Sequence, residues 1–303
     1  YLGSDALALL PLTKKVAYLE EGDHAVLTRE GAEIYDIKGS SVSRQITYLN
    51  QSINFHDKSG FNHLMEKEIH EQPIALERAI SSYLSASTDK PTFNLLKNIN
   101  FTEVSRIIMV ACGTAHYACY VAKYWIEKFS SVPVNVELSS EYRYRSPAAA
   151  MYSCMIVISQ SGESIDTLMA MREAKRWNLK TTAITNIENS SIDREADYSI
   201  YTHVGPEVGV ASTKSFTSQL IVLLSIAMKI GWYNKKITSE KYKDFIQNLK
   251  LNITHLRYLM KLLTVYHLVH VDEKYIDYWW SRLYWKYGSS FINRQRLFFN
   301  NYW

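Results

Sequence analysis

Between positions 106 and 232, apolar residues form two kinds of segment that alternate along the chain. Short apolar runs, typical of buried strands, lie at 107–111, 134–138, 154–158, 181–184 and 198–202. Stretches with helical spacing lie between or after them, at 115–129, 164–177 and 213–232. Strands separated by helices of this length form a parallel sheet with helices on both faces. The pattern therefore predicts an α/β fold.

The first 84 residues have a different pattern. Three strand-like runs, at 16–19, 24–27 and 32–36, are separated by turn-forming residues and predict a small β-meander. Residues 39–60 are polar and weakly patterned, which favours a linker. From 61 to 84 apolar residues recur at helical spacing, and we expect Pro73 to kink this helix or to begin a new one.

Composition and charge exclude several classes of protein. Hydrophobic residues make up 47% of the chain and charged residues 21%, which excludes a disordered chain. The net charge of +4 comes without any run of five like charges, so no nucleic-acid partner is expected. The longest apolar stretch, 220–228, is too short to span a bilayer, so no membrane partner is expected either. Three cysteines without CxxC spacing predict reduced thiols in the cytoplasm and no metal site.

Two predicted strand ends are rich in glycine and small hydroxyl residues. Residues 112–114 read CGT, and residues 159–167 read SQSGESIDT, with no lysine or arginine in either. Unpaired N–H groups at a helix N-terminus can hold a phosphate without a cation, and Gly113 and Gly162 allow close approach of the backbone. No Walker loop or GxGxxG fingerprint is present, so no nucleotide cofactor is predicted. The pattern suggests a monophosphate on a polyhydroxylated molecule, whereas ordinary helix caps remain the alternative, favoured for 112–114 taken alone.

Polar residues near these loops have structural interpretations as well. Cys119 and Cys154 lie in apolar stretches and read as inert core residues, and His116 reads as structural or exposed. Glu163 and Asp166 are typical partners of a helix N-terminus. We interpret Arg143 and Arg145 as members of surface or interface ion pairs. For Lys214, stabilising the start of a helix is at least as good an interpretation as binding an anion.

Five segments carry a resemblance to a known family. The chain resembles the first sugar isomerase (SIS) domain of the glutamine–fructose-6-phosphate aminotransferases in the segments ACGT at 111–114, SQSGE at 159–163, EVGVASTK at 207–214, EKEIHEQP at 66–73 and SEYRYR at 140–145. Residues 4–11 and 19–23 resemble the end of that family's glutaminase domain. The resemblance extends to about residue 260, and it implies a parallel sheet of the flavodoxin-like type.

The resemblance also implies substrates and site residues. Members of the family make glucosamine 6-phosphate from fructose 6-phosphate and glutamine, as homo-oligomers, which here implies a dimer and no cofactor. It implies that the phosphate is bound by Ser159, Gln160, Ser161 and Thr167, and that the sugar site is lined by Cys112, Gly113, Thr114, Val210 and Ser212. The family's usual serine after Thr114 is Ala115 here, so one hydroxyl contact is in doubt, worth about 1 kcal/mol.

The implied organisation has five parts. They are the end of a glutaminase domain (1–47), a linker (48–60), the first SIS domain (61–240), a helical connection (241–270) and a tail (271–303). Neither the glutaminase cysteine nor the second SIS domain, with its Schiff-base lysine, is matched, so we assign no catalytic residue and expect the chain to be inactive alone. A non-catalytic sugar-phosphate sensor is the alternative. A membrane-associated protein ranks last, because charges interrupt the aromatic tail.

The tail is aromatic out of proportion to the rest of the chain. Residues 275–303 hold 12 of the 39 aromatic residues, without periodicity. Read one base later, the codons of Tyr278-Trp279-Trp280 must give Ile or Thr followed by two glycines, whichever synonymous codons are used. An apolar strand running into a glycine-rich turn is expected where the family's second SIS domain begins. We therefore predict that the tail is a frameshifted reading of that domain.

Overall fold

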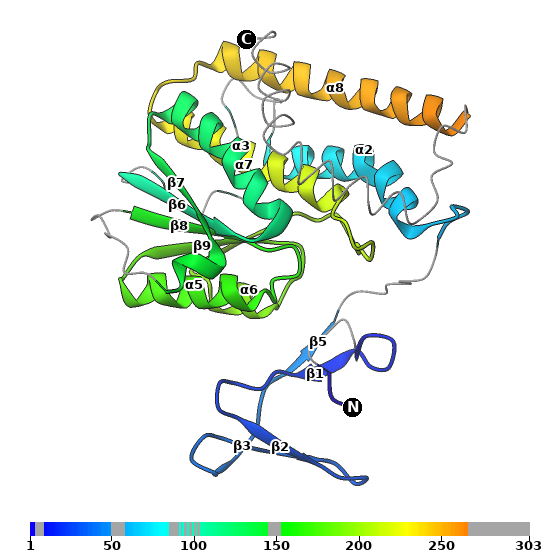
Figure 1. Cartoon of the computed structure of the whole chain (residues 1–303), viewed down its shortest axis with the longest axis vertical. Coiled ribbons are helices and arrows are strands. Elements are labelled where there is room, and N and C mark those ends of the chain that lie inside the picture. The colour runs from blue at the N-terminus through cyan, green and yellow to red at the C-terminus, as the bar shows by residue number, and fades with distance from the viewer. Residues whose placement is uncertain are drawn as a thin grey trace. The chain divides into compact units, whose positions relative to one another are not determined.

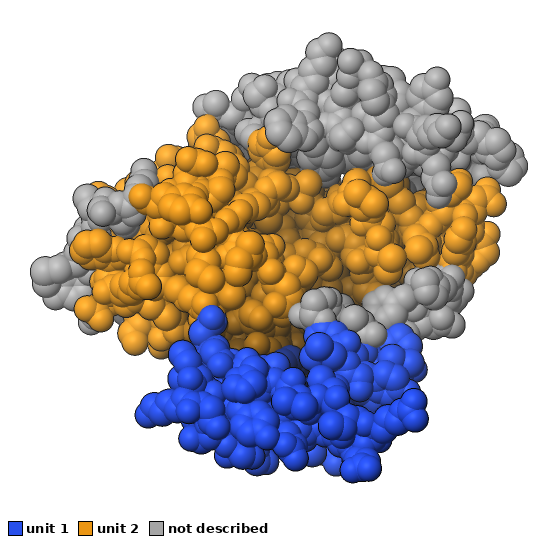
Figure 2. Space-filling model, turned by 60° about the horizontal axis from the view of Figure 1, so that its bottom comes forward, with its two compact units in different colours: residues 1–55 blue, residues 56–303 orange. Residues whose placement is uncertain are grey.

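The computed structural model describes residues 1–3, 9–49, 58–84, 104–144 and 153–265, together with residues 91, 93, 96, 99 and 101 (Figure 1). Side chains of the last helix are described up to residue 258. The chain divides into two compact units, residues 1–55 and residues 56–303 (Figure 2). The predicted tail, 271–303, and Arg145 lie outside the described residues.

Unit 1 consists of short antiparallel strands. Strand β1 (Lys15–Ala17) pairs with β5 (Ile46–Tyr48), and a three-stranded sheet joins β2 (His24–Leu27), β3 (Ala32–Tyr35) and β4 (Ser41–Val42). The predicted meander is confirmed for β2 and β3. It is wrong for its first run, 16–19, because β1 pairs with β5 and not with β2. The prediction of a linker from residue 39 is wrong for β4 and β5, because strands of two and three residues are too short to show an alternating pattern.

One ion pair connects distant parts of unit 1. The Arg44 guanidinium donates two hydrogen bonds to the Asp23 carboxylate, at 2.8 and 2.7 Å. This pairing, with a further bond from the Glu20 N–H, lowers the pKa of Asp23 to about 2. The fork geometry of arginine fixes the direction of approach, so the pair orients the segment before β5 against the turn before β2.

Unit 2 contains the predicted parallel sheet. Its strands are β6 (Arg106–Ala111), β7 (Val134–Leu138), β8 (Ser153–Ile158), β9 (Lys180–Thr185) and β10 (Tyr198–Tyr201), in the order β10-β9-β8-β6-β7. All four strand pairs are parallel. This order is the flavodoxin-like one, and it places the change of winding direction between β6 and β8.

Helices cover both faces of the sheet (Figure 1). One face carries α3 (Gly113–Ser130) and α7 (Lys214–Tyr233), with α2 (Leu64–Tyr83) and α8 (Ser239–Val265) beyond them. The other carries α5 (Ile165–Arg176) and α6 (Ser191–Glu195), and the short α4 (Ser139–Tyr142) follows β7. Alternate residues of β6 enter the two cores: Ile107 and Met109 face the α3–α7 layer, and Ile108 and Val110 face the α5 layer.

Of the two alternatives predicted for Pro73, a new helix that begins there is wrong. The proline lies inside one continuous 20-residue helix and is buried, so it neither ends that helix nor begins another. A proline in a helix interior forgoes one backbone hydrogen bond. Since α2 packs against both α7 and α8, tertiary contacts outweigh that loss.

Helix α7 is the central helix of its layer. Within the described residues it alone is long and apolar enough to cross a membrane, yet 83% of its most apolar window is buried inside the protein. A helix that is hydrophobic all round and buried in this way is a core helix. Its position matters for function, because its N-terminal half reaches the carboxyl ends of the strands.

Candidate functional site

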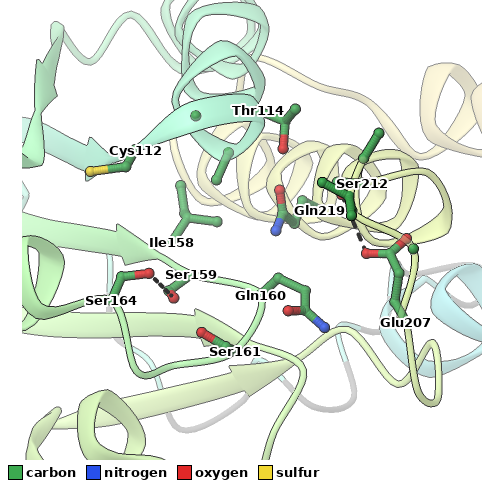
Figure 3. Close-up of a pocket in the computed structure, with 15 residues that line it drawn as sticks. Cys112, Thr114, Ile158, Ser159, Gln160, Ser161, Ser164, Glu207, Ser212 and Gln219 are labelled. Atoms are coloured by element: carbon green, nitrogen blue, oxygen red, sulfur yellow. Dashed lines mark hydrogen bonds between the residues drawn. The ribbon is translucent and has the colours of Figure 1, made fainter. Parts of the chain in front are cut away.

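A cavity of about 440 Å³ opens at the carboxyl ends of β6 and β8 (Figure 3). These two strands are neighbours in the sheet, and the chain winds outward from them in opposite directions. Open α/β sheets bind their ligands at such a point. Three loops and one helix side chain line the cavity.

The first wall is the turn from β6 into α3. Cys112, Gly113 and Thr114 line the cavity here, and Ala115 follows them. Gly113 has a φ of +57°, which a glycine adopts without strain and other residues rarely adopt. Because Gly113 begins an 18-residue helix, the unpaired N–H groups of its first turn lie at this wall.

The second wall is the loop from β8 into α5. Ser159, Gln160, Ser161 and Ser164 line the cavity here. The Ser159 hydroxyl accepts a hydrogen bond from the Gly162 N–H (3.1 Å) and lies 3.0 Å from the Ser164 hydroxyl. Ser164 is the N-cap residue of α5. Hydroxyl groups and a helix N-terminus are therefore brought together by a tight turn of six residues.

Gly162 makes that turn possible for two reasons. Its φ is +69°, and a Cβ at this position would lie 2.0 Å from the Ser190 hydroxyl oxygen. Its carbonyl oxygen accepts a hydrogen bond from Ile192 at 3.0 Å, which ties the loop to α6. A side chain at this position would displace the loop, so the backbone of this wall depends on glycine.

The third wall is the loop between β10 and α7. Glu207, Gly209, Val210, Ala211 and Ser212 line the cavity from this side. Glu207 Oε1 accepts hydrogen bonds from the backbone N–H groups of Thr213 (2.9 Å) and Ser215 (3.2 Å). The carboxylate therefore caps the N-terminus of α7, and its charge is stabilised by that helix end.

Helix α2 holds this loop from outside. The Glu68 carboxylate is 3% exposed and accepts hydrogen bonds from the N–H groups of Val208 (2.6 Å) and Gly209 (3.1 Å). Burial raises the pKa of Glu68, although the two backbone bonds act in the opposite direction. Beside it, Lys214 Nζ lies 2.6 Å from Glu71 Oε2. Two acidic residues of one helix thus fix the position of the loop.

The electrostatics of the cavity favour a compact anion. None of the described residues that line it is a cation, and the carboxylate of Glu207 is engaged by backbone N–H groups. The N-termini of α3 and α5 both end at the cavity, and each supplies about half a positive charge. Within the described ranges, no three His, Cys, Asp or Glu side chains come close enough together to hold a metal ion.

Comparison with known proteins shows what this domain is similar to. Residues 100–229 match the model of the SIS domain family. Over these residues the chain is similar to SIS domains, and we call the cavity described above the SIS cavity. A solved C-terminal domain of glucosamine-fructose-6-phosphate aminotransferase from Francisella tularensis is 37% identical, with a TM-score of 0.61; the match covers 65% of this chain and 56% of that one.

Curated relatives extend the similarity beyond the SIS domain. The glutamine–fructose-6-phosphate aminotransferase of Zymomonas mobilis is 45% identical over 254 residues, which is 82% of this chain and 41% of that protein. The enzyme of the same name from Acinetobacter baylyi is 41% identical over 255 residues, which is 82% of this chain and 42% of that protein. The chain thus spans about two fifths of the length of the curated relatives that it matches, and these relatives are enzymes.

Most of the residues assigned to the site from sequence meet at the SIS cavity. Those that line it are Cys112, Gly113, Thr114, Ser159, Gln160, Ser161, Val210 and Ser212. Thr167 does not: it is fully buried, and its hydroxyl lies 2.9 Å from the Ser139 hydroxyl. Thr167 lies in the first turn of α5 and faces the core, whereas Ser164, three residues earlier, lies at the cavity. Ligand contacts by these residues stay a prediction.

The sequence did not assign a site role to some residues that line the SIS cavity. Ser164 lay within the segment singled out but was not assigned a role, and Glu207 was read only as part of a motif. Gln219, on α7, also lines the cavity. Its sequence signal is one polar residue among the apolar residues of a buried helix. Helical spacing of apolar residues over 213–232 does not single out one polar residue of this kind.

Other candidates prove structural in the SIS domain. Burial raises the pKa of the Cys154 thiol to about 12 and also raises that of Cys119, so neither thiol forms a nucleophilic thiolate at neutral pH. Burial lowers the pKa of His116, which lies outside the cavity lining. Arg143 pairs with Asp166 at 2.6 Å. Burial thus accounts for the two thiols, and the ion pair with Asp166 accounts for Arg143.

Proposed function

We propose that the cavity binds fructose 6-phosphate or glucosamine 6-phosphate, and that the chain supplies this SIS domain to the synthesis of glucosamine 6-phosphate from fructose 6-phosphate and glutamine. The observation that carries the proposal is the pairing of two helix N-termini with a ring of hydroxyl groups, free of lining cations, at the β6–β8 switch point. Such a site suits a sugar monophosphate.

In the proposed binding mode, the phosphate lies against Ser159, Gln160, Ser161 and Ser164, where the N-terminus of α5 faces it. Hydroxyls and backbone N–H groups then donate charge-assisted hydrogen bonds to the phosphate oxygens. The sugar extends toward Thr114, Val210 and Ser212. The enzyme names of the relatives favour this function over a non-catalytic sensor, which uses the same cavity without chemistry.

The remaining parts of the proposal concern the chain as a whole. We infer that residues 1–47 correspond to the end of a glutaminase domain and residues 61–240 to the first SIS domain. We expect the chain alone to release no glutamate from glutamine, to work as a dimer in the cytoplasm, and to need no cofactor. The three free cysteines, two of them buried, are compatible with a reducing compartment.

Isothermal titration of the pure 303-residue chain tests the binding proposal. Fructose 6-phosphate and glucosamine 6-phosphate should bind, inorganic phosphate should bind more weakly, and fructose without phosphate should give no measurable heat. Fructose binding as tightly as its phosphate, or no binding of either sugar phosphate, would refute the proposal. A variant with Ser239→Ala, a serine of α8 outside the cavity, serves as the control and should bind like the unmodified chain.

A further inference from the structure

Gln219 stands out among the side chains that line the cavity. It projects from α7 into the cavity, on the side of Thr114 and Ser212 and across from Ser159, Ser161 and Ser164 (Figure 3). The residue is 2% exposed. Its Oε1 atom has no hydrogen-bond partner among the residues that the structure describes.

A buried amide oxygen without a donor weakens a fold. The free energy lost by removing such a group from water is not recovered, which is why nearly all buried polar atoms are paired. The following positions of α7, 221–224, are isoleucine, valine and two leucines, all buried. An apolar residue at position 219 would leave no unpaired polar atom at this point of the helix. Stability therefore does not account for the amide.

A ligand in the cavity would supply the missing donor. The loop from β8 into α5 contributes hydroxyl and backbone N–H groups to the cavity. On the opposite side, the Oε1 atom of Gln219 has no donor among the described residues. The sugar part of a sugar phosphate carries O–H donors, which its doubly ionised phosphate group lacks. The position of the amide, across the cavity from the phosphate loop, matches the sugar part of a bound sugar phosphate.

We propose that Gln219 is a sugar-binding residue whose side-chain oxygen accepts a hydrogen bond from a hydroxyl of the bound sugar phosphate. The proposal rests on the function proposed above and adds to it a residue that distinguishes the sugar from its phosphate. Gln219 thereby contributes to affinity for the sugar and not to affinity for phosphate alone.

The test replaces the amide by an apolar group of similar size. Gln219→Leu should weaken binding of fructose 6-phosphate about fivefold, the factor that corresponds to one net hydrogen bond of ~1 kcal/mol. Binding of inorganic phosphate should stay unchanged. The melting temperature of the unliganded variant should be equal to or higher than that of the unmodified chain, because an unpaired polar atom has been removed from the interior.

Two further variants complete the experiment. Gln219→Met, with an unbranched side chain, repeats the test without the shape of leucine, and Gln247→Leu, at an exposed position of α8, is the matched control and should bind both ligands normally. Unchanged affinity for fructose 6-phosphate would overturn the proposal, as would an equal loss for both ligands.

The stability measurement separates a binding role from a structural one. A lower melting temperature or failure to fold in both the Leu and the Met variant would show that the amide supports the fold, and would also overturn the proposal. If the unmodified chain bound no sugar phosphate at all, the proposed function would fail and this inference with it. Normal binding by the unmodified chain with unaffected variants would refute the role of Gln219 alone.

Discussion

Substitution of Gly209 by alanine should break the contact between α2 and the cavity loop. A Cβ at position 209 would lie 2.5 Å from Glu68 Oε2 and 3.5 Å from the Cα atom of Met65. The first distance is far below van der Waals contact, so the Glu68 carboxylate must move away. Since that carboxylate is 3% exposed, it cannot move without losing the backbone N–H groups of Val208 and Gly209.

The expected loss follows from those two hydrogen bonds. A hydrogen bond to a charged group contributes about 1.5–3 kcal/mol, so the pair sets an upper limit of about 3–6 kcal/mol. The loop is partly exposed, with Val208 at 43%, and water will replace part of what is lost. We therefore expect Gly209→Ala to lower the free energy of unfolding by about 2–3 kcal/mol.

Urea unfolding followed by tryptophan fluorescence measures this loss in unit 2, because residues 1–55 contain no tryptophan. Glu68→Ala removes the group that the new methyl would strike, so Gly209→Ala should cause little further loss in that background. The control is Glu77→Ala, on the same helix, where the exposed carboxylate pairs with Arg257 and should contribute less than about 1 kcal/mol. Additive effects of the Gly209 and Glu68 substitutions, or a loss at Gly209 no larger than at Glu77, would refute this reasoning.

Three shorter predictions concern the phosphate loop, the core and the gene. Ser161→Ala should weaken fructose 6-phosphate binding by about 1–2 kcal/mol, and equal affinity in a titration would contradict a phosphate contact at this hydroxyl. Burial lowers the pKa of Lys229 to about 8 in the folded chain, against about 10.4 when unfolded. Between these two pH values the unfolded chain binds more protons than the folded one. The free energy of unfolding should therefore rise with pH by about 3 kcal/mol over this range. Urea titrations at these two pH values should show the rise for the unmodified chain and not for Lys229→Met. The same rise in both proteins would contradict this prediction. The gene, translated one base later across residues 275–303, should read as a sugar isomerase domain, and stop codons there would exclude a frameshift.

The α/β fold was predictable because its main elements are long and buried. The run from Ile107 to Ala111 is apolar on both faces, which is typical of a short strand covered on two sides. The elements that were missed are short: β4, β5, α4 and α6 have two to five residues each. Segments of that length carry no measurable period, and long-range contacts rather than local preference decide their structure.

The phosphate side of the cavity was predictable for a related reason. Ser159, Gln160 and Ser161 are consecutive, so one turn brings them together and the sequence displays them as a cluster. Ser164 and Thr167 lie three residues apart, a spacing that within a regular helix would place both on one face. Ser164 is instead the N-cap residue of α5, with extended backbone, and it reaches the cavity while Thr167, inside the helix, faces Ser139. Gln219 enters from a helix that begins 50 residues after that loop, and no local signal connects the two.

The N-termini of α3, α5 and α7 have different partners, which explains how a carboxylate can line a proposed anion site. A free carboxylate at Glu207 would repel a phosphate in the same cavity. Instead, Glu207 Oε1 accepts hydrogen bonds from the N–H groups of Thr213, the N-cap residue of α7, and Ser215, in its first turn. That helix end is therefore already occupied by a charge of the protein itself. The N-termini of α3 and α5 have no acidic residue among the cavity-lining side chains of their own loops, and they are the ends available to the phosphate. The negative charge of Glu207 thus serves to fix the loop between β10 and α7. In the proposed binding mode, affinity for phosphate comes from the two helices that follow β6 and β8.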